Sequence, residues 1–172
     1  MAIKAVYGIS NAKMGITGVN GAMGTVLTDV TPIAADSVNI AFPEPTETEI
    51  VPEDYEDALA VLEEQGVKTV ELDCMNVSTD NLALLFGGSA TAGKFTPGVA
   101  FVLPEQSFQF TTRPLNGTKQ TWSFPRTKLT VSITANPSKK NTLNLHFKFS
   151  ILAPTDATGK KLPSWMVEEI ED

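Results

Sequence analysis

The sequence is poor in the residues on which most enzyme and metal sites depend. It holds one cysteine, Cys74, and one histidine, His146. A lone cysteine excludes an internal disulfide and a zinc site built from cysteines. The chain also lacks any run of the roughly 18 to 20 apolar residues that a membrane-spanning helix requires, and its first residues lack the apolar segment of a secretory signal peptide. We therefore expect a cytoplasmic protein without a membrane partner.

Basic residues are scarce in the first half of the chain. Residues 1–92 contain 14 acidic and three basic residues, a net charge of −11, whereas residues 93–161 contain ten basic and two acidic residues, a net charge of +8. The last eleven residues add −4, for a total of −7. Opposite blocks suit a subunit that docks on copies of itself, although an accidental asymmetry on a solvated surface explains the charges equally well. The acidic total argues against a general nucleic-acid binder, which needs a basic surface.

Candidate catalytic and metal-binding residues are few, and none comes with a supporting motif. His146 lies on the polar side of an alternating run, where a surface or interface histidine is the expected role, because no local motif supplies the partner that a general base needs. Cys74 falls on the apolar side of its run, which predicts a buried, inert thiol. The carboxylates of residues 44–64 lack the spacing of a calcium loop. They predict an acidic rim that faces either solvent or the lumen of an assembly. We therefore predict no catalytic, cofactor or metal site and no enzymatic activity.

One segment, Gly88-Ser-Ala-Thr-Ala-Gly-Lys94, is close to a phosphate-binding P-loop. The Ser or Thr that should follow the lysine to hold magnesium is replaced by Phe95. The segment is also expected to follow a helix as a loop and to precede a strand, whereas a P-loop runs from a strand into a helix. The segment therefore does not predict nucleotide binding.

Alternation of apolar and polar residues predicts a chain made mainly of strands. The predicted strands are Val38–Phe42, Val67–Cys74, Leu129–Thr134 and Leu143–Leu152, with Val99–Leu103 and Phe108–Thr112 as further candidates. In the clearest run, Leu143, Leu145, Phe147, Phe149 and Ile151 point to one side and form the expected buried face. The polar segment Asn136–Thr142 is expected to join the last two runs as an antiparallel hairpin.

Helix signals are fewer. In Ser78–Gly87, Ser78 or Thr79 can cap the start, Leu82, Leu85 and Phe86 form an apolar stripe, and Gly87 can end the helix. The segment Glu53–Gln65 fits a helix or, equally, an acidic loop followed by a strand that enters the sheet.

The ends of the chain are expected to be appendages of a single domain spanning residues 1–172, whose 42% hydrophobic content is typical of globular proteins. The glycine-rich stretch at about residues 8–25 predicts turns and a flexible N-terminal arm. The acidic C-terminal tail at about residues 163–172, with Trp165, Met166 and Ile170 beside acids, predicts a short docking helix.

The order of these elements carries a family resemblance. An acidic segment (Val38–Val51), the run Gly66-Val-Lys-Thr-Val-Glu-Leu72, a short capped helix ending Gly87-Gly88 and a long β region with Trp122-Ser-Phe-Pro-Arg126 follow one another. Over roughly residues 24–156 this resembles the major tail tube proteins of tailed bacteriophages and the related tube proteins of contractile injection machines. The arm and the acidic tail lie outside the match.

The resemblance implies a mainly β fold, a β-sandwich or barrel with one short α-helix packed at its side. It also implies a non-enzymatic virion structural protein, assembled in the host cytoplasm with other tail proteins. Six copies would form a ring, rings would stack into a tube, and DNA would pass through the lumen. Two alternatives remain: a tail terminator or neck protein of the same machine, and a carbohydrate-binding or adhesin β-sandwich. The latter needs an exposed aromatic platform, for which only two tryptophans and two tyrosines exist.

Overall fold

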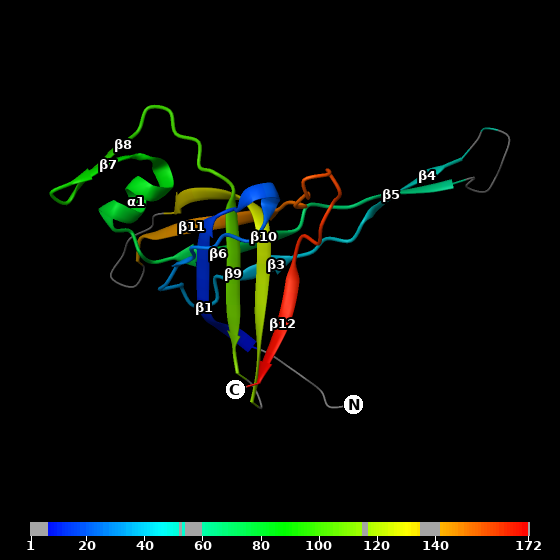
Figure 1. The fold of residues 1–172 in the computed structure, drawn as a ribbon, viewed down its shortest axis with the longest axis horizontal. Coiled ribbons are helices and arrows are strands. Elements are labelled where there is room, and N and C mark those ends of the chain that lie inside the picture. Colours follow the sequence, from blue (N-terminus) through cyan, green and yellow to red (C-terminus); the bar gives the residue numbers. More distant parts are fainter. Residues whose placement is uncertain (1–6, 52, 54–59, 115–116, 135–141, 172) are drawn as a thin grey trace.

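The computed structural model describes residues 7–51, 53, 60–114, 117–134 and 142–171 of the chain (Figure 1). These residues form a mainly β fold with one short α-helix, which confirms the predicted fold class. The elements are β1 (Tyr7–Ile16), a 3-10 turn (Val19–Gly21), β2 (Thr28–Asp29), β3 (Asn39–Ala41), β4 (Thr46–Ile50), β5 (Ala60–Glu64), β6 (Thr69–Cys74), α1 (Thr79–Phe86), β7 (Gly88–Thr91), β8 (Lys94–Pro97), β9 (Gln106–Arg113), β10 (Thr118–Thr134), β11 (Asn144–Ile151) and β12 (Met166–Glu171).

Most strands belong to one antiparallel sheet in the order β2-β1-β9-β10-β11-β6-β3, with β12 also paired to β10. The long strand β10 belongs to two parts of this sheet, which we call the first and the second wing. Its first half pairs with β9 and β12, and its second half, from Thr127, pairs with β11. The pairing of β9 with β10 shifts register between Phe124 and Thr127, where Pro125 has no N–H to donate to the ladder. The first wing (β2, β1, β9, the first half of β10, and β12) therefore crosses the second wing (the second half of β10, β11, β6 and β3), as Figure 1 shows.

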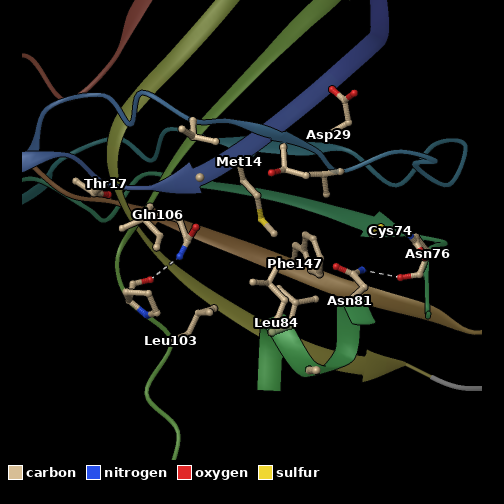
Figure 2. Close-up of a pocket in the computed structure, with 18 of the residues that line it drawn as sticks. Met14, Thr17, Asp29, Cys74, Asn76, Asn81, Leu84, Leu103, Gln106 and Phe147 are labelled. Carbon is tan, nitrogen blue, oxygen red and sulfur yellow. Dashed lines mark hydrogen bonds between the residues drawn. The ribbon is translucent and has the colours of Figure 1, made fainter. Parts of the chain in front are cut away.

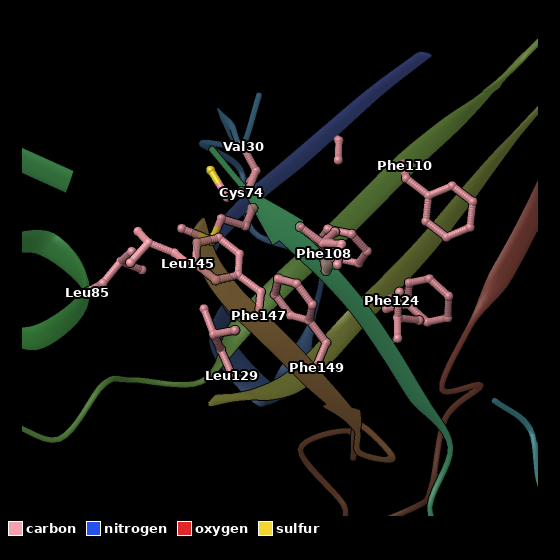
Figure 3. Packing of buried hydrophobic residues seen from close by; sticks show 14 of the residues in the cluster. Val30, Cys74, Leu85, Phe108, Phe110, Phe124, Leu129, Leu145, Phe147 and Phe149 are labelled. Atoms are coloured by element: carbon pink, nitrogen blue, oxygen red, sulfur yellow. The ribbon is translucent and has the colours of Figure 1, made fainter. Parts of the chain in front are cut away.

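The hydrophobic core lies between the two wings. Phe108 from β9 stacks on Phe149 from β11 with ring centroids 4.0 Å apart, a contact that joins the wings at the centre of the molecule (Figure 3). In β11, Leu145, Phe147, Phe149 and Ile151 are all buried, as the alternation predicts. Along the neighbouring strand β6, the apolar residues Val70, Leu72 and Cys74 are also buried. The predicted core faces of these two strands are confirmed.

Residues 28–34 close the sheet into a barrel. Their first part pairs as β2 with β1, and the Val30 N–H donates to the Ala12 carbonyl over 2.9 Å. Their last part lies along β6, where the Ala34 N–H donates to the Asp73 carbonyl over 2.8 Å and Ile33 bridges Cys74. Because one segment bonds to both wings, it covers edges that would otherwise be open.

The N-terminal part of the predicted flexible arm is a strand. β1 pairs with β9 along its length, and its Ala12 and Met14 side chains are buried in the core. Gly15 serves a close backbone approach rather than a turn, because a Cβ there would lie 2.0 Å from the Val26 carbonyl oxygen. Residues 17–25 do form turns, but they are held to the sheet: the Ser107 hydroxyl accepts from the Gly24 N–H and donates to the Pro125 carbonyl. The prediction of a flexible arm over the whole of 8–25 is wrong.

Other local predictions also need correction. The acidic tail forms strand β12 instead of a docking helix. Val99–Leu103 is irregular, and the expected loop Gly87–Gly93 instead begins the β7–β8 hairpin. Within Glu53–Gln65, residues 60–64 form strand β5, which enters a separate two-stranded sheet with β4, whereas residues 54–59 lie outside the described residues. The predicted loop at 136–142 also lies mostly outside them, but the antiparallel pairing of β10 with β11 is confirmed.

Candidate functional site

The β4–β5 hairpin is the most exposed feature of the described chain. It projects from one end of the long axis of the molecule, away from the barrel (Figure 1). All ten residues of its two strands are exposed. A two-stranded hairpin is at best marginally stable in water on its own, and neither of these strands is covered by any other part of the chain that the structure describes.

The two faces of this hairpin differ in chemistry. The cross-strand pairs Thr46–Glu64, Thr48–Leu62 and Ile50–Ala60 share one face, which is apolar around Ile50 and Leu62 and carries one carboxylate, Glu64, at its end. The pairs Glu47–Glu63 and Glu49–Val61 form the opposite face, where two carboxylates stand directly across from each other. Like charges opposed in this way destabilise an isolated pair. Neither strand contains a lysine or arginine, so neither strand supplies a cation to pair with these carboxylates.

A groove lies at the other end of the molecule, beside α1. Its volume is about 740 Å³, and it runs between α1, the segment 101–104 and the end of β1 (Figure 2). Apolar side chains dominate its lining, including Met14, Leu84, Leu85, Leu103 and Phe147. Val99 and Val102, on the neighbouring loop, are almost fully exposed. The groove and its surroundings therefore present apolar surface to whatever docks there.

Local sequence signals fix the helix that borders this groove. The Ser78 hydroxyl caps α1 by accepting from the Asn81 N–H, as predicted, and the Asn81 side-chain amide donates to the Asn76 carbonyl over 2.7 Å (Figure 2). Gly87 ends the helix with a φ of 68°, a conformation that favours glycine. A Cβ on Gly87 would lie 2.4 Å from the Phe101 ring. Gly87 therefore has a second role: it lets the loop that carries Phe101 pack against the end of the helix.

The single histidine makes a cross-strand hydrogen bond to an aspartate. His146 Nδ1 lies 2.8 Å from Asp73 Oδ1, on the outer face of the second wing, and Lys148 Nζ lies 3.0 Å from Glu71 Oε1 in the adjacent pair. Ser132 stands directly across β10 from His146, so Asp, His and Ser follow one another across three strands. Among the described residues no hydrogen bond joins Ser132 to His146, and the groove beside α1 does not include this row. The predicted surface position of His146 is confirmed.

Cys74 is buried against the groove, as predicted, with 1% of its surface exposed. Burial raises the pKa of this thiol, which keeps it protonated and a poor nucleophile at neutral pH.

The residues that resemble a P-loop form a β-hairpin. Gly88–Thr91 pairs with Lys94–Pro97, and Ala92 and Gly93 make the turn with positive φ angles. The backbone therefore does not run from a strand into a helix. No group of three or more histidine, cysteine or acidic side chains among the described residues is close enough to hold a metal ion.

Sequence reasoning did not predict the pair formed by Arg126 and Glu105. Arg126 donates from Nε and Nη2 to the two carboxylate oxygens of Glu105, over 2.6 and 2.9 Å, and from Nη1 to the Ala153 carbonyl. The hydrogen bonds from Arg126 lower the pKa of Glu105. The pair ties the chain before β9 to the bend of β10. Because the two residues lie 21 positions apart in irregular context, no periodic pattern connects them.

Comparisons with known proteins do not identify a family. No protein-family model matches the chain, and a search of curated proteins found no significant match. Within the described part of the chain, no helix has the length and apolar character needed to cross a membrane.

Proposed function

We propose that this protein is a virion structural protein, a subunit of a bacteriophage tail tube that assembles as stacked rings of six around a channel for DNA. The ring of six subunits and the central channel are parts of the proposal that rest on the family resemblance. The exposed β4–β5 hairpin is the observation that carries the proposal, because both of its strands are exposed along their whole length and nothing in the described part of the chain covers them.

The positions of the hairpin and the groove favour head-to-tail stacking. The hairpin leaves one end of the long axis, and the groove beside α1 lies toward the other (Figure 1). When two different surfaces of identical subunits bind each other, the subunit at each end of the assembly still has one of these surfaces unoccupied. More subunits therefore add head to tail, unless the assembly closes into a ring. The apolar face of the hairpin, with Ile50 and Leu62, matches the apolar lining of the groove in character.

The carbohydrate-binding alternative has less support. The rings of Trp122 and Trp165 stack on each other with centroids 5.8 Å apart and an interplanar angle of 12°, and Trp165 also contacts Phe42. These contacts occupy ring faces that a sugar platform would need to expose.

Negative-stain electron microscopy of concentrated protein tests the proposal directly. We expect rings and tubes. Rings that never stack would favour the terminator or neck alternative, and a monomer that binds glycans would favour the adhesin alternative. A protein that stays monomeric at all concentrations, alone or with its neighbouring virion proteins, would overturn the proposal.

A matched pair of variants tests the role of the hairpin. Leu62→Ser alters its apolar face, and Val61→Ser, the neighbouring residue, alters its acidic face; both side chains are exposed in the single chain. Neither change should affect folding by more than about 0.5 kcal/mol, because surface substitutions rarely do. We expect Leu62→Ser to weaken tube formation more than Val61→Ser does. Tubes that form equally well with both variants would contradict docking through the apolar face.

A further inference from the structure

Resting on the proposed function, we propose that neighbouring copies within a ring join by strand pairing: β12 of one subunit lies along residues 128–134 of β10 in the next. Such a contact continues the antiparallel sheet from one subunit into another, a mode of recognition in which main-chain hydrogen bonds hold a strand at an exposed sheet edge. The partner is therefore a second copy of this chain. Three features of the two edges support the pairing: their length, their opposite directions and their charge.

Two edges of the large sheet are long and regular, and each lacks a neighbouring strand in the part of the chain that the structure describes. β12 pairs with β10 alone, without a register shift (Figure 1). In β10, pairing with β9 ends at Thr127, whereas pairing with β11 continues without a shift to Thr134, so residues 128–134 have a strand on one side only. The other edges are poorer templates, because β2 and β3 are two and three residues long and register shifts interrupt the open first half of β1.

The two open edges lie on opposite sides of β10. Thr121 and Ser123 each have β9 on one side and β12 on the other, and Thr127 has β9 on one side and β11 on the other. β11 and β12 therefore share one side of β10. The edge of β12 is open away from β9, while the edge of residues 128–134 is open on the side that β9 has left. A subunit with two different edges facing opposite ways binds its copies head to tail, and a fixed rotation between copies closes them into a ring.

The charges of the two edges oppose self-pairing and favour this partner. β12 carries three carboxylates, Glu168, Glu169 and Glu171, and no basic residue. Two copies of β12 laid side by side would bring these like charges together, which destabilises a strand pair. Residues 128–134 contain Lys128 and no acidic residue. The acidic edge therefore excludes an identical edge and accepts the edge of β10.

Hydrogen bonds identify the backbone groups of β12 that point toward a neighbour. The Gln120 N–H donates to Thr112 Oγ1 on β9 over 2.9 Å, so the backbone of Gln120 points to β9 and away from β12. Along antiparallel strands, pairs that exchange two backbone hydrogen bonds alternate with pairs that exchange none. Gln120 and Glu169 therefore exchange none, and neither do Trp122 and Val167, the next pair of this kind. The N–H of Val167 consequently points out of the open edge.

The same reasoning applies to the edge of β10. The Ile151 N–H donates to the Lys68 carbonyl over 2.9 Å, so Ile151 directs its backbone away from β10 and exchanges no backbone hydrogen bond with its cross-strand partner, Thr127. The register continues without a shift, and Ile133 lies an even number of positions after Thr127, so Ile133 also belongs to a pair without backbone hydrogen bonds. Its N–H points out of the edge that β9 has left.

Proline substitution at these two positions tests the pairing, because proline removes the N–H and is tolerated in an edge strand where that N–H faces solvent. The test variants are Val167→Pro and Ile133→Pro. The matched controls, Val167→Ala and Ile133→Ala, shorten the same side chains, keep the N–H and leave the charge unchanged. Circular dichroism melting checks the fold, and negative-stain electron microscopy counts rings. We expect both alanine variants to form rings and both proline variants to lose them. Rings that form with either folded proline variant would overturn the pairing and leave the tube function standing.

Cross-linking gives a second measurement that does not depend on how the proline variants fold. Glu168→Cys on β12 and Thr130→Cys on β10 replace exposed residues, and the only native thiol, Cys74, is buried. Rings assembled from each variant alone, and from an equal mixture, are treated with a bis-maleimide about 10 Å long, which spans twice the spacing between strands. We expect covalent dimers from the mixture alone. Mixed rings that yield no dimer, or single-variant rings that yield as much, would overturn the pairing. A parent protein that forms no rings would instead remove the proposed function.

Discussion

At the scale of single residues, stability is concentrated in a few aromatic side chains that belong to different wings. Phe108, Phe124, Phe147 and Phe149 are fully buried, and Phe147 and Phe149 meet edge to face with centroids 6.2 Å apart. Each such ring buries a large apolar area and also makes specific contacts with its neighbours. Because the wings are joined through these rings, a single truncation affects both.

We expect Phe147→Ala to lower the free energy of unfolding by about 3–5 kcal/mol, the usual cost of emptying a buried phenylalanine site. Ile133→Ala, on the same hairpin but about half exposed, is the control and should change stability by less than about 0.5 kcal/mol. Chemical denaturation of both variants measures this. A loss well below about 1 kcal/mol for Phe147→Ala would show that this side of β11 does not face the core.

The Glu105–Arg126 pair predicts a pH-dependent contribution to stability. Because the pKa of Glu105 is lowered in the folded protein, the pair stabilises the fold above the carboxyl's ordinary pKa and loses this contribution as pH falls through the folded value. About two-fifths of the Glu105 side chain is exposed, so solvent screening limits the effect to less than about 1 kcal/mol. Glu105→Gln should be slightly less stable than the parent at neutral pH, and the difference should shrink in acid. A difference that grows as pH falls would contradict this account.

At the scale of elements, periodicity predicts strands well where one face is buried and the other is wet. β11 and β6 were predictable because their buried residues alternate with half-buried or exposed ones. The helix α1 was predictable because its cap and its apolar stripe of Leu82, Leu85 and Phe86 are local signals. β1 was not, because it overlaps a stretch, residues 8–25, whose five glycines indicate turns, although Gly15 is there to admit a neighbouring backbone. β12 was missed for another reason: its six residues are all exposed, so burial imposes no alternation on them.

The hairpin site illustrates the same limit. The acidic composition of residues 44–64 was visible, and a solvated rim was a fair expectation. The pairing of Glu47 with Glu63, and the apolar face on the opposite side, depend on the turn that sets the register. No pattern of residues fixed that register, because neither face of the hairpin is buried in its own chain.

Gly15 gives an element-scale test. A methyl group at this position would collide with the Val26 carbonyl, so Gly15→Ala must push residues 17–26 away from β1. We expect a loss of stability of roughly 1–3 kcal/mol, the range for overpacking in a closely packed site, together with faster proteolysis between β1 and β2. Thermal unfolding and limited proteolysis measure both effects. An unchanged melting temperature would mean that the close approach of these two backbones contributes little.

At the scale of the whole molecule, the charge distribution predicts how assembly responds to salt. The acidic face of the hairpin lies in the block of residues 1–92, whose net charge is −11, and the net charge of residues 93–161 is +8. If unlike blocks meet between rings, tube formation should weaken as salt rises, since the screening length falls to about 3 Å at 1 M. Light scattering across a salt series measures this. Tubes that form equally well or better at high salt would assign stacking to apolar contacts, which salt leaves unchanged or strengthens.

The pairing of β1 with β9 has a consequence for the order in which the chain acquires its structure. Ser10 bonds to the backbone of Thr111, 101 positions later, so the N-terminal strand has no sheet to join until the ribosome has made and released the β9 region. Contacts of such long range make folding slow, and a waiting segment with unpaired strand edges is open to aggregation. During this interval we expect the surplus of carboxylates in the first half of the chain to keep the nascent segment extended and soluble through mutual repulsion.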